Sequence, residues 1–448
     1  MLEGICFLKR ESMKERILYQ EADQKTMKKL LFAICMILTT LTLIAPSVSG
    51  ATSQQETISV LIDDLPVTFD VEPVMLSGRT LVPFRAVVER LNTQVDWDSD
   101  TQTVTAKKGD TRIRLQMGSK SAYRNGNNIL MDVPPMIEDG RTLIPLRFFA
   151  EAFDCDVAWN SNTYTVNIIS PSTSMEVIGF YALGDKNTSS WTNLFGINYP
   201  QTNKGNTGAV SELALGWYSL DETGTLLTQS RTGWQRPDGW ETVLKAAGTY
   251  KLETEMVIHL TDQGSTINKF LNNKFAQDKA VDQIVKEAQI YGGVNLDFEG
   301  LGWNAGLEEL QGIKNNFTSF IKLLSSQLKE ADLNLTLTLH APNSAYKGYD
   351  YAALGSLADR IIIMAYDYGS RPEPVDLVMQ AVETASHAVP PEKLVLGISA
   401  PSETAASIIA KVGIAKRYDL KGIALWRLGV ISEEMWDTLK KHIDPINI

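Results

Sequence analysis

The segment GGVNLDFEG, residues 292–300, carries the side chains of this chain that are best suited to chemistry. Side chains on a strand alternate between its two faces, so Asn295, Asp297 and Glu299 would share one face and the intervening apolar residues the other. Crowding an aspartate against a glutamate raises the pKa of one of them, as a general acid working near neutral pH requires. A structural polar cluster is the alternative, because ion-pair networks also perturb carboxylates. The spacing favours a catalytic pair.

The sequence beyond residue 175 alternates between apolar strand patterns and helical patterns, which indicates βα units around a parallel sheet. Eight strands in about 270 residues match a (β/α)8 TIM barrel, an α/β fold. A doubly wound sheet is the competing fold, but no glycine-rich phosphate-binding turn follows the first strand. In a barrel, Glu299 and its polar neighbours would point inward and reach the carboxyl end, where active sites lie. The predicted strands lie near residues 177–182, 212–218, 255–260, 293–299, 335–340, 360–366, 393–398 and 422–427.

The acidic segment is similar to the D-G-x-D-x-D-x-E signature of family 18 glycoside hydrolases, the family of chitinases and endo-N-acetylglucosaminidases. The resemblance runs from about residue 175 to the C-terminus. It places Glu299 on the family's catalytic acid and Asp297 on the carboxylate that orients the substrate acetamido group. Asn295 would line the same substrate site.

Two further strands carry the resemblance. MAYDYG, residues 364–369, is similar to the M-x-Y-[DN] motif of the family's sixth strand and places Met364, Tyr366 and Asp367 at the substrate site. GIALWRLG, residues 422–429, resembles the last strand, where Trp426 would form the floor of the subsite that holds the cleaved sugar.

The resemblance implies a substrate-assisted retaining mechanism in which the N-acetyl oxygen of the substrate is the nucleophile. Glu299 would protonate the leaving oxygen and then act as base toward water. Asp297 would stabilise the oxazolinium intermediate, and Tyr366 would hold the acetamido oxygen in line for attack. This chemistry requires neither a metal nor a cofactor.

Two departures from the family pattern bear on the substrate. Gly292 and Asn295 occupy positions where the signature has aspartates, and the result resembles the GVN-x-DFE form of spore-cortex-lytic members, which act on peptidoglycan. The connection between the last two predicted strands, from Ser399 to Leu420, is short. Chitinases commonly carry an inserted subdomain there, so its absence predicts an open groove.

Several other side chains end predicted strands and are weaker candidates. His259 and His340 end the third and fifth strands and would face the active site, with hydrogen-bonded rim residues as the alternative to a binding role. Two histidines do not make a metal site. Tyr181 and Trp217, near the ends of the first two strands, could stack on sugar rings, and core packing is equally compatible with their positions.

An internal repeat precedes the predicted barrel. Residues 78–106 and 140–168 are offset by 62 positions (140 minus 78) and share 13 identities in 29 positions. Each unit predicts a strand, a short helix and a hairpin, so this region is expected to be a small α+β domain. It resembles the copper amine oxidase N-terminal-like domain of exported Gram-positive proteins. Residues 52–170 contain no histidine, which argues against copper.

The tryptophans of the repeats, Trp97 and Trp159, could be sugar platforms, but core positions are favoured by the usual burial of tryptophan. The domain is interpreted as a spacer or a module that associates with the cell wall.

The N-terminus predicts export. Met27-Lys28-Lys29 opens an apolar run to Ala45 that ends in small residues, as in a signal peptide, and Met27 is a candidate start alternative to Met1. The apolar run is shorter than the roughly 20 residues of a membrane span, so stable membrane insertion is not expected. The expected organisation is a leader (1–51), the repeat domain (52–169), a polar linker (170–174) and the barrel (175–448).

Charge and cysteine content agree with a secreted, wall-associated protein. Removing the leader leaves 35 basic and 48 acidic residues (42 minus 7 and 53 minus 5), an acidic balance that argues against a nucleic-acid partner. Cys155 alone remains in the mature chain, so no intramolecular disulfide can form. We therefore expect a glycosidase whose partner is a polysaccharide, peptidoglycan before chitin oligomers. A non-catalytic glycan-binding barrel is the alternative from another class.

Overall fold

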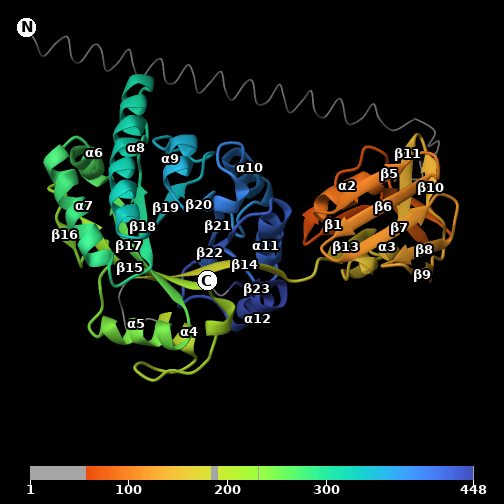
Figure 1. Ribbon diagram of the computed structural model, residues 1–448, viewed down its shortest axis with the longest axis horizontal. Helices are drawn as coiled ribbons and strands as arrows, with labels where there is room; N and C mark the ends of the chain where they lie inside the picture. Colours follow the sequence, from red (N-terminus) through yellow and green to blue (C-terminus); the bar gives the residue numbers. More distant parts are fainter. Residues whose placement is uncertain (1–56, 183–189, 231, 447–448) are drawn as a thin grey trace, which may run out of the picture. The chain divides into compact units, whose positions relative to one another are not determined.

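The computed structural model describes residues 57–182, 190–230 and 232–446 of the chain (Figure 1). The predicted leader and signal peptide lie outside the described residues. None of the described helices combines the length and apolarity that crossing a membrane would require.

Eight parallel strands close into a barrel, as the sequence predicts. The hydrogen-bonded order is β14-β15-β17-β18-β19-β20-β21-β22, and β22 pairs with β14 to complete the ring. All eight predicted strands are present at the expected places, which confirms the TIM-barrel fold class. The strands are β14 (Thr173–Ala182), β15 (Glu212–Leu220), β17 (Glu253–Thr261), β18 (Gly293–Glu299), β19 (Asn334–His340), β20 (Arg360–Met364), β21 (Leu394–Ser399) and β22 (Gly422–Trp426).

The first barrel strand begins earlier than expected. β14 starts at Thr173, inside the segment 170–174 predicted as a linker. Its first residues pair with a short strand at the C-terminus, β23 (Ile443–Pro445), so that Thr173 faces Ile443. This pairing at the start of the barrel explains why polar residues with linker character are extended here. The remaining short strand, β16 (Leu226–Leu227), pairs antiparallel with the end of β15.

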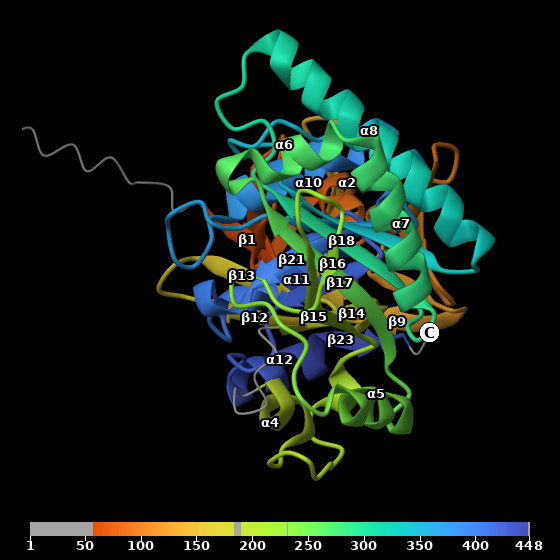
Figure 2. The ribbon, with the colours of Figure 1, turned by 90° about the vertical axis from the view of Figure 1, so that its left-hand side faces the viewer.

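Helices surround the barrel and supply its outer core. The long helix α8 and the helix α7 lie side by side along the outside of the barrel (Figure 2). Phe298 points outward from β18 and packs on Phe317 and Phe320 of α8, with ring centroids 6.1 Å apart in both pairs. The helices are α4 (Ser190–Phe195), α5 (Trp240–Thr249), α6 (Thr266–Leu271), α7 (Lys274–Ala288), α8 (Leu307–Glu330), α9 (Tyr351–Leu357), α10 (Val375–Ser386), α11 (Ser407–Arg417) and α12 (Glu433–His442).

The connection between β21 and β22 is described throughout and contains one short 3-10 turn, Ala400–Ser402, and helix α11. No inserted subdomain lies in this connection, as the sequence predicts.

A buried ionic network fills the amino end of the barrel interior. The guanidinium of Arg360 lies 2.8 Å from a carboxylate oxygen of Glu176 and 2.7 Å from oxygens of Glu212 and Glu255. Its Nε donates to the hydroxyl of Thr336 over 3.0 Å, and that hydroxyl donates to Glu255. The five side chains come from five strands of the barrel and are each at most 6 % exposed. One cation therefore ties together strands far apart in the sequence.

The repeat domain consists of three small sheets and two short helices, which confirms the predicted α+β class and the order strand, helix, hairpin in each unit. The first unit has β4 (Arg79–Pro83), α2 (Phe84–Arg90), β5 (Gln94–Asp98) and β6 (Thr103–Lys108). The second has β11 (Arg141–Pro145), α3 (Leu146–Ala152), β12 (Asp156–Asn160) and β13 (Thr165–Ile169). The remaining strands are β1 (Ser59–Ile62), β2 (Leu65–Pro66), β3 (Val74–Leu76), β7 (Thr111–Gln116), β8 (Ser121–Arg124), β9 (Asn127–Leu130) and β10 (Met136–Glu138).

The two repeats meet in an antiparallel pairing of β4 with β11. Val82 faces Ile144, which is its own equivalent in the second repeat because 144 minus 82 equals the repeat offset of 62. Both residues are fully buried. The repeats are thus related by a local two-fold arrangement about this pair.

The expectation that Trp97 and Trp159 belong to the core of this domain is wrong. They are 45 % and 37 % exposed. Each lies on the outer strand of its hairpin, at the fourth position of β5 and of β12, and the two strands share the same largely exposed burial pattern. β5 and β12 are edge strands of their sheets, and only one face of each hairpin packs on the core.

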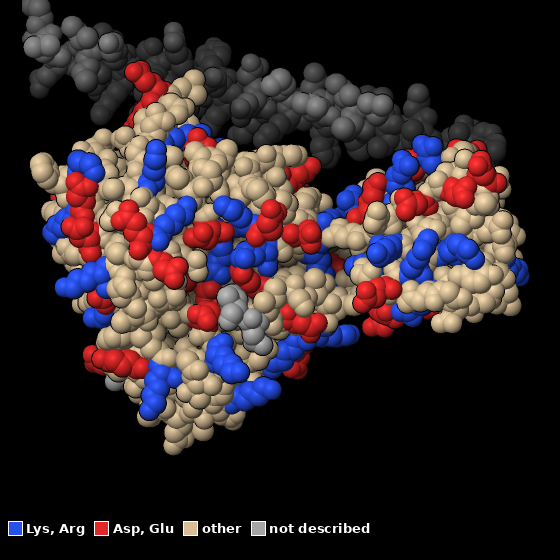
Figure 3. Space-filling model, viewed as in Figure 1, with Lys and Arg blue, Asp and Glu red and all other residues tan. Residues whose placement is uncertain are grey.

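Surface charge is mixed rather than segregated. On the face drawn in Figure 3, acidic and basic side chains alternate over both the barrel and the repeat domain. The chain's net charge of −11 is therefore not concentrated in one patch of that face.

Arg360→Met should destabilise the barrel strongly, because it leaves buried Glu212 and Glu255 without a cation and Glu176 with Lys421 alone. Breaking a buried ion pair from one side costs about 3–5 kcal/mol. Denaturant unfolding of the full chain measures the loss. Lys322→Met, which removes an exposed cation on α8, is the matched control and should be neutral. Equal stabilities of the two variants would show that the network does not hold the barrel together.

Candidate active site

The acidic segment forms β18 and delivers its polar face to the barrel interior, as predicted. Asn295, Asp297 and Glu299 point inward, whereas Val294, Leu296 and Phe298 belong to the outer core. Asn295 is fully buried and Asp297 is 3 % exposed, whereas the Glu299 side chain keeps 31 % of its surface. Exposure therefore increases toward the carboxyl end of the strand, and Glu299 is the acidic group that substrate can reach.

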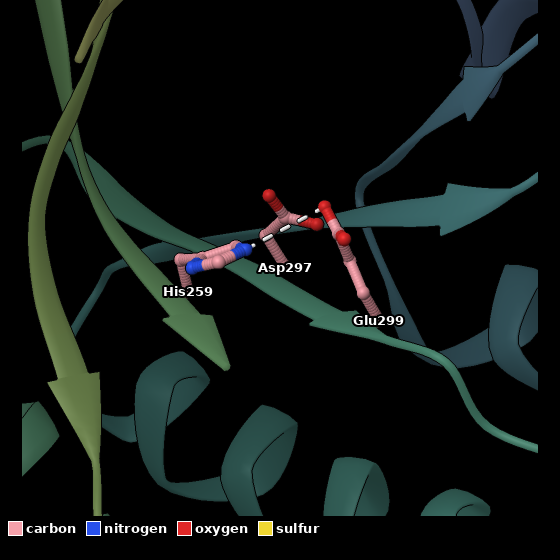
Figure 4. A group of neighbouring side chains, drawn as sticks. All are labelled: His259, Asp297 and Glu299. Atoms are coloured by element: carbon pink, nitrogen blue, oxygen red, sulfur yellow. Dashed lines mark ion pairs between the residues drawn. The ribbon is translucent and has the colours of Figure 1, made fainter. Parts of the chain in front are cut away.

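His259 lies beside the carboxylates of Asp297 and Glu299 (Figure 4). It lies on β17 in register with Asp297, and its Nε2 is 3.6 Å from Oε1 of Glu299. The imidazole is stacked on the indole of Trp234, with ring centroids 4.2 Å apart and planes 7° from parallel. A tightly stacked, buried imidazole has little freedom to turn, so His259 fixes one side of the Glu299 carboxylate.

The pKa values of the two carboxylates are pushed apart. Burial, reinforced by the neighbouring Glu299 charge, raises the pKa of Asp297 well above its usual value. Burial alone would also raise the pKa of Glu299, but the imidazoles of His259 and His340 outweigh it and lower that pKa. These directions favour Asp297 over Glu299 as the group that holds a proton shared by the pair.

Two polar atoms on the inward face of β18 are buried without a partner. Among the described residues, Oδ1 of Asp297 and Nδ2 of Asn295 lack a hydrogen-bond partner, while Oδ1 of Asn295 accepts from Thr338 over 2.8 Å. An unpartnered buried polar atom costs about 1–3 kcal/mol. Such atoms mark a place where a ligand can supply the missing hydrogen bonds.

Met364, Tyr366 and Asp367 lie at the end of β20 and just beyond it, as the motif predicts. Met364 ends the strand and is buried, Tyr366 is half-buried, and Asp367 is exposed with a left-handed φ of 65°. Burial, then the charges of Asp297 and Glu299, raise the pKa of Tyr366, so its hydroxyl lies in the field of the acidic pair and stays protonated. Burial, Glu373 and Glu299 raise the pKa of Asp367.

Trp426 ends β22 inside the barrel and is half-buried. Its indole stacks on Trp234 at 5.2 Å, with the planes 21° apart, and packs edge-on against Phe180 at 5.6 Å. Trp426, Trp234 and His259 thus form a continuous aromatic stack that ends at Glu299.

The structure does not support Tyr181 and Trp217 as substrate-binding residues. They are 1 % and 0 % exposed and belong to the outer core between the strands and the helices. Their rings contact each other at 6.3 Å. The inward positions of β14 are instead Ile178, Phe180 and Ala182.

Three aromatic residues at the site were not predicted from the sequence. Trp234 lies in a loop with no periodic pattern, and its ring occupies the space over Gly216, where any Cβ would fall 2.5 Å from the indole. Trp303, 65 % exposed, contacts Tyr346 at 6.4 Å, and Tyr346 stacks on His340 at 4.0 Å. The position of Trp303, four residues after Glu299, is the one sequence signal that could have found it.

The cluster contains donor types that also bind metals. One donor atom each from His259, Asp297 and Glu299 lies within 4.8 Å of the others. Burial, which raises the pKa of Asp297, disfavours the anionic form of the carboxyl that a metal would need. The expectation of a metal-free site stays a prediction.

Comparison with known proteins agrees with this geometry. Residues 261–403 match the model of glycosyl hydrolases family 18, and residues 61–168 match the copper amine oxidase N-terminal domain. The family 18 match runs from the end of β17 to the turn that follows β21. The name of the second domain mentions copper, but burial raises the pKa of its Cys155 thiol to about 12, which leaves it a poor metal ligand.

Relatives of the family 18 domain include proteins of spore-forming bacteria. A Bacillus subtilis protein that bears the name sporulation-specific glycosylase YdhD is 30% identical over 157 residues, 32% of this chain and 36% of that protein. The cortical fragment-lytic enzyme of Bacillus anthracis is 23% identical over 222 residues, 39% of this chain and 50% of that enzyme. The matches thus span half or less of these curated relatives.

The fold is shared with the spore cortex-lytic enzyme SleL of Bacillus megaterium QM B1551. The two structures superpose with a TM-score of 0.51 at 16% identity, covering 71% of this chain and 80% of that one.

Asp297→Asn should make the chain increasingly more stable than wild type as pH rises. The folded-state pKa of Asp297 is raised, so wild-type stability is unaffected below the unfolded pKa of about 3.9 and decreases above it until the folded pKa is passed. The amide has no such penalty. Urea unfolding at pH 4 and pH 7 measures the difference. Asp282→Asn, at an exposed position on α7, is the control, and a pH-independent difference for Asp297→Asn would contradict the raised pKa.

Proposed function

We propose that this chain is a secreted glycoside hydrolase that cleaves N-acetylglucosamine-containing glycans by substrate-assisted retaining catalysis. The observation that carries the proposal is the pair Asp297 and Glu299 on one strand, with opposite pKa shifts and with Tyr366 in their field. Two carboxylates on the same face of one strand cannot flank a sugar from opposite sides. This arrangement favours a nucleophile that belongs to the substrate.

The proton shared by Asp297 and Glu299 moves toward Glu299 in the first step. A substrate acetamido N–H can donate to the unpartnered Oδ1 of Asp297, which favours the ionised form of that carboxyl. The proton shared by the pair then belongs on Glu299, where the leaving glycosidic oxygen can take it. Substrate binding thus converts Glu299 from a resting carboxylate into the acid.

The remaining steps use groups already in place. Tyr366 donates its hydroxyl hydrogen bond to the acetamido oxygen and holds it in line with the anomeric carbon. The ionised Asp297 stabilises the positive oxazolinium ring as the bond to the leaving sugar breaks. Glu299, now a carboxylate beside His259, takes a proton from the water that opens this ring. The acetamido oxygen attacks the anomeric carbon from the face opposite the leaving sugar, and water then displaces that oxygen from the other face. The two inversions together retain the configuration.

Peptidoglycan is the substrate we favour, and chitin oligomers are second. Asn295 in place of an aspartate, the direct connection between β21 and β22, and relatives named for cortex lysis support the first choice. The exposed Trp303, which contacts Tyr346 beside His340, offers a platform for a sugar ring. Secretion is proposed from the predicted signal peptide, which agrees with a polymeric substrate outside the cell.

Glu299→Gln should reduce turnover on the glycan by about 10²–10⁴-fold, because the amide keeps the shape and loses the transferable proton. Mass spectrometry of new reducing ends from purified peptidoglycan and from chitin oligomers measures the rate. Glu309→Gln, at an exposed position on α8, is the matched control and should retain full activity. A wild-type chain that binds these glycans without cutting any of them would instead establish the non-catalytic glycan-binding barrel.

Substrates without the acetamido carbonyl should not be cleaved if the substrate supplies the nucleophile. A thiazoline mimic of the cyclised intermediate should inhibit competitively, because it has the geometry that the transition state approaches. Asp297→Asn should be severely impaired in turnover. Isolation of a covalent glycosyl adduct on Asp297, or cleavage of a deacetylated glycan, would refute this mechanism.

A further inference from the structure

The repeat domain has two grooves that are built from equivalent residues. Groove A contains Trp97 and has a volume of about 910 Å³, and groove B contains Trp159 and has a volume of about 870 Å³. Adding the repeat offset of 62 to most lining residues of groove A gives lining residues of groove B. The corresponding pairs include Pro83 and Pro145, Arg85 and Arg147, Glu89 and Glu151, and Trp97 and Trp159.

The grooves are completed reciprocally by the two repeats. In groove B, Arg79 of the first repeat lies 2.6 Å from Asp132, which precedes the second repeat. In groove A, Arg141 of the second repeat lies 2.5 Å from Asp70, which precedes the first repeat. Asp132 is the equivalent of Asp70 under the same offset (132 minus 70), so each ion pair is the two-fold counterpart of the other. The same ion pair at equivalent positions of both grooves indicates that it is a feature of the repeat rather than a chance contact.

Each groove offers an indole above an apolar floor. Trp97 pairs across its hairpin with Val104, and Trp159 pairs with Val166. The two valines are buried and line the grooves, while the tryptophans are 45 % and 37 % exposed. A large exposed aromatic residue supported from below is an unusual surface feature, and it suits a ligand with a flat apolar face and a polar edge.

The grooves are electrically balanced within an acidic chain. Groove A contains Arg85 and Arg141 against Asp70 and Glu89. Groove B has two arginines and two carboxylates at the equivalent positions. Neither groove presents a net charge, so neither selects an anionic or cationic partner, although the paired side chains can donate and accept hydrogen bonds with hydroxyl groups.

We propose that grooves A and B are two equivalent binding sites for an uncharged pyranose polymer, which make the repeat domain a bivalent glycan-binding module. A pyranose ring has an apolar face for the indole and hydroxyls for the Arg–Asp pair. Two equivalent grooves suit a polymer of repeating units, because binding at one site raises the effective concentration at the other. That the polymer is the N-acetylglucosamine glycan of the barrel rests on the proposed function; the grooves themselves do not depend on it.

Retention of the full chain on insoluble glycan tests the proposal. In a Glu299→Gln background that prevents cleavage, the dissociation constants for chitin particles and for purified peptidoglycan are measured by depletion. Trp97→Ala and Trp159→Ala should each weaken binding at least tenfold, because either change removes bivalency, and the double variant should weaken it further. Phe275→Ala, which removes an 88 % exposed aromatic residue on α7, is the matched control and should bind as its parent does.

Separate controls test whether a variant is misfolded and which class of ligand the grooves bind. Trp97→Phe with Trp159→Phe keeps an aromatic face and should restore most of the retention, which a general folding defect would not allow. A double alanine variant that is retained as well as the Phe275→Ala chain overturns the proposal. Binding of a proline-rich peptide with no binding of glycan also overturns it, in favour of a peptide-docking groove. Hydrolysis of soluble oligomers by the chain with native Glu299 reports on the barrel alone, so an inactive barrel and inert grooves give different results.

Discussion

The interaction on which the barrel most depends is the contact of one buried guanidinium with three buried carboxylates. Arg360 joins Glu176, Glu212 and Glu255, which come from three strands on the other side of the barrel interior. Lys421 supplies a second cation, 2.8 Å from Glu176, which leaves one negative charge in excess, and burial raises the pKa of Glu212, so one proton on the cluster balances its charge. With its amino end closed by a polar network, the barrel needs no residues there for function, and its chemistry is confined to the carboxyl end.

Between these two polar ends lies an apolar layer that keeps them electrically separate. Ile178, Val257 and Ile362 fill the middle of the interior, each fully or almost fully buried. This layer desolvates Asp297 from below while Glu299 stays in contact with the surface. The difference in exposure, together with the imidazole of His259, explains why two chemically similar groups two residues apart shift in opposite directions. The opposite pKa shifts of Asp297 and Glu299 therefore depend on the layers of the barrel interior as much as on the sequence of β18.

The sequence predicts those parts of the structure where polar and apolar residues alternate. On β18 and β19 the alternation is complete, and the inward positions of Asp297, Glu299 and His340 were predicted correctly. On β14 the residues from Val177 to Ala182 are apolar or glycine on both faces apart from the Tyr181 hydroxyl, so the pattern could not show that Tyr181 points outward. Trp234 was missed because its position is set by tertiary packing over Gly216, with no local periodicity to reveal it.

The repeat domain shows why its grooves must exist as a pair. Exposed ion pairs such as Arg79–Asp132 contribute at most about 1 kcal/mol, so they cannot hold the two repeats together. The two repeats are held together by the antiparallel pairing of β4 with β11. Val82 and Ile144 are fully buried there, at the centre of the local two-fold arrangement. A single repeat would expose this strand edge and would lose the aspartate that completes its groove. The same hydrophobic pairing that makes the domain fold therefore also joins the two tryptophan grooves in one domain, and linkage of two sites is the first condition for bivalent binding to a repetitive polymer.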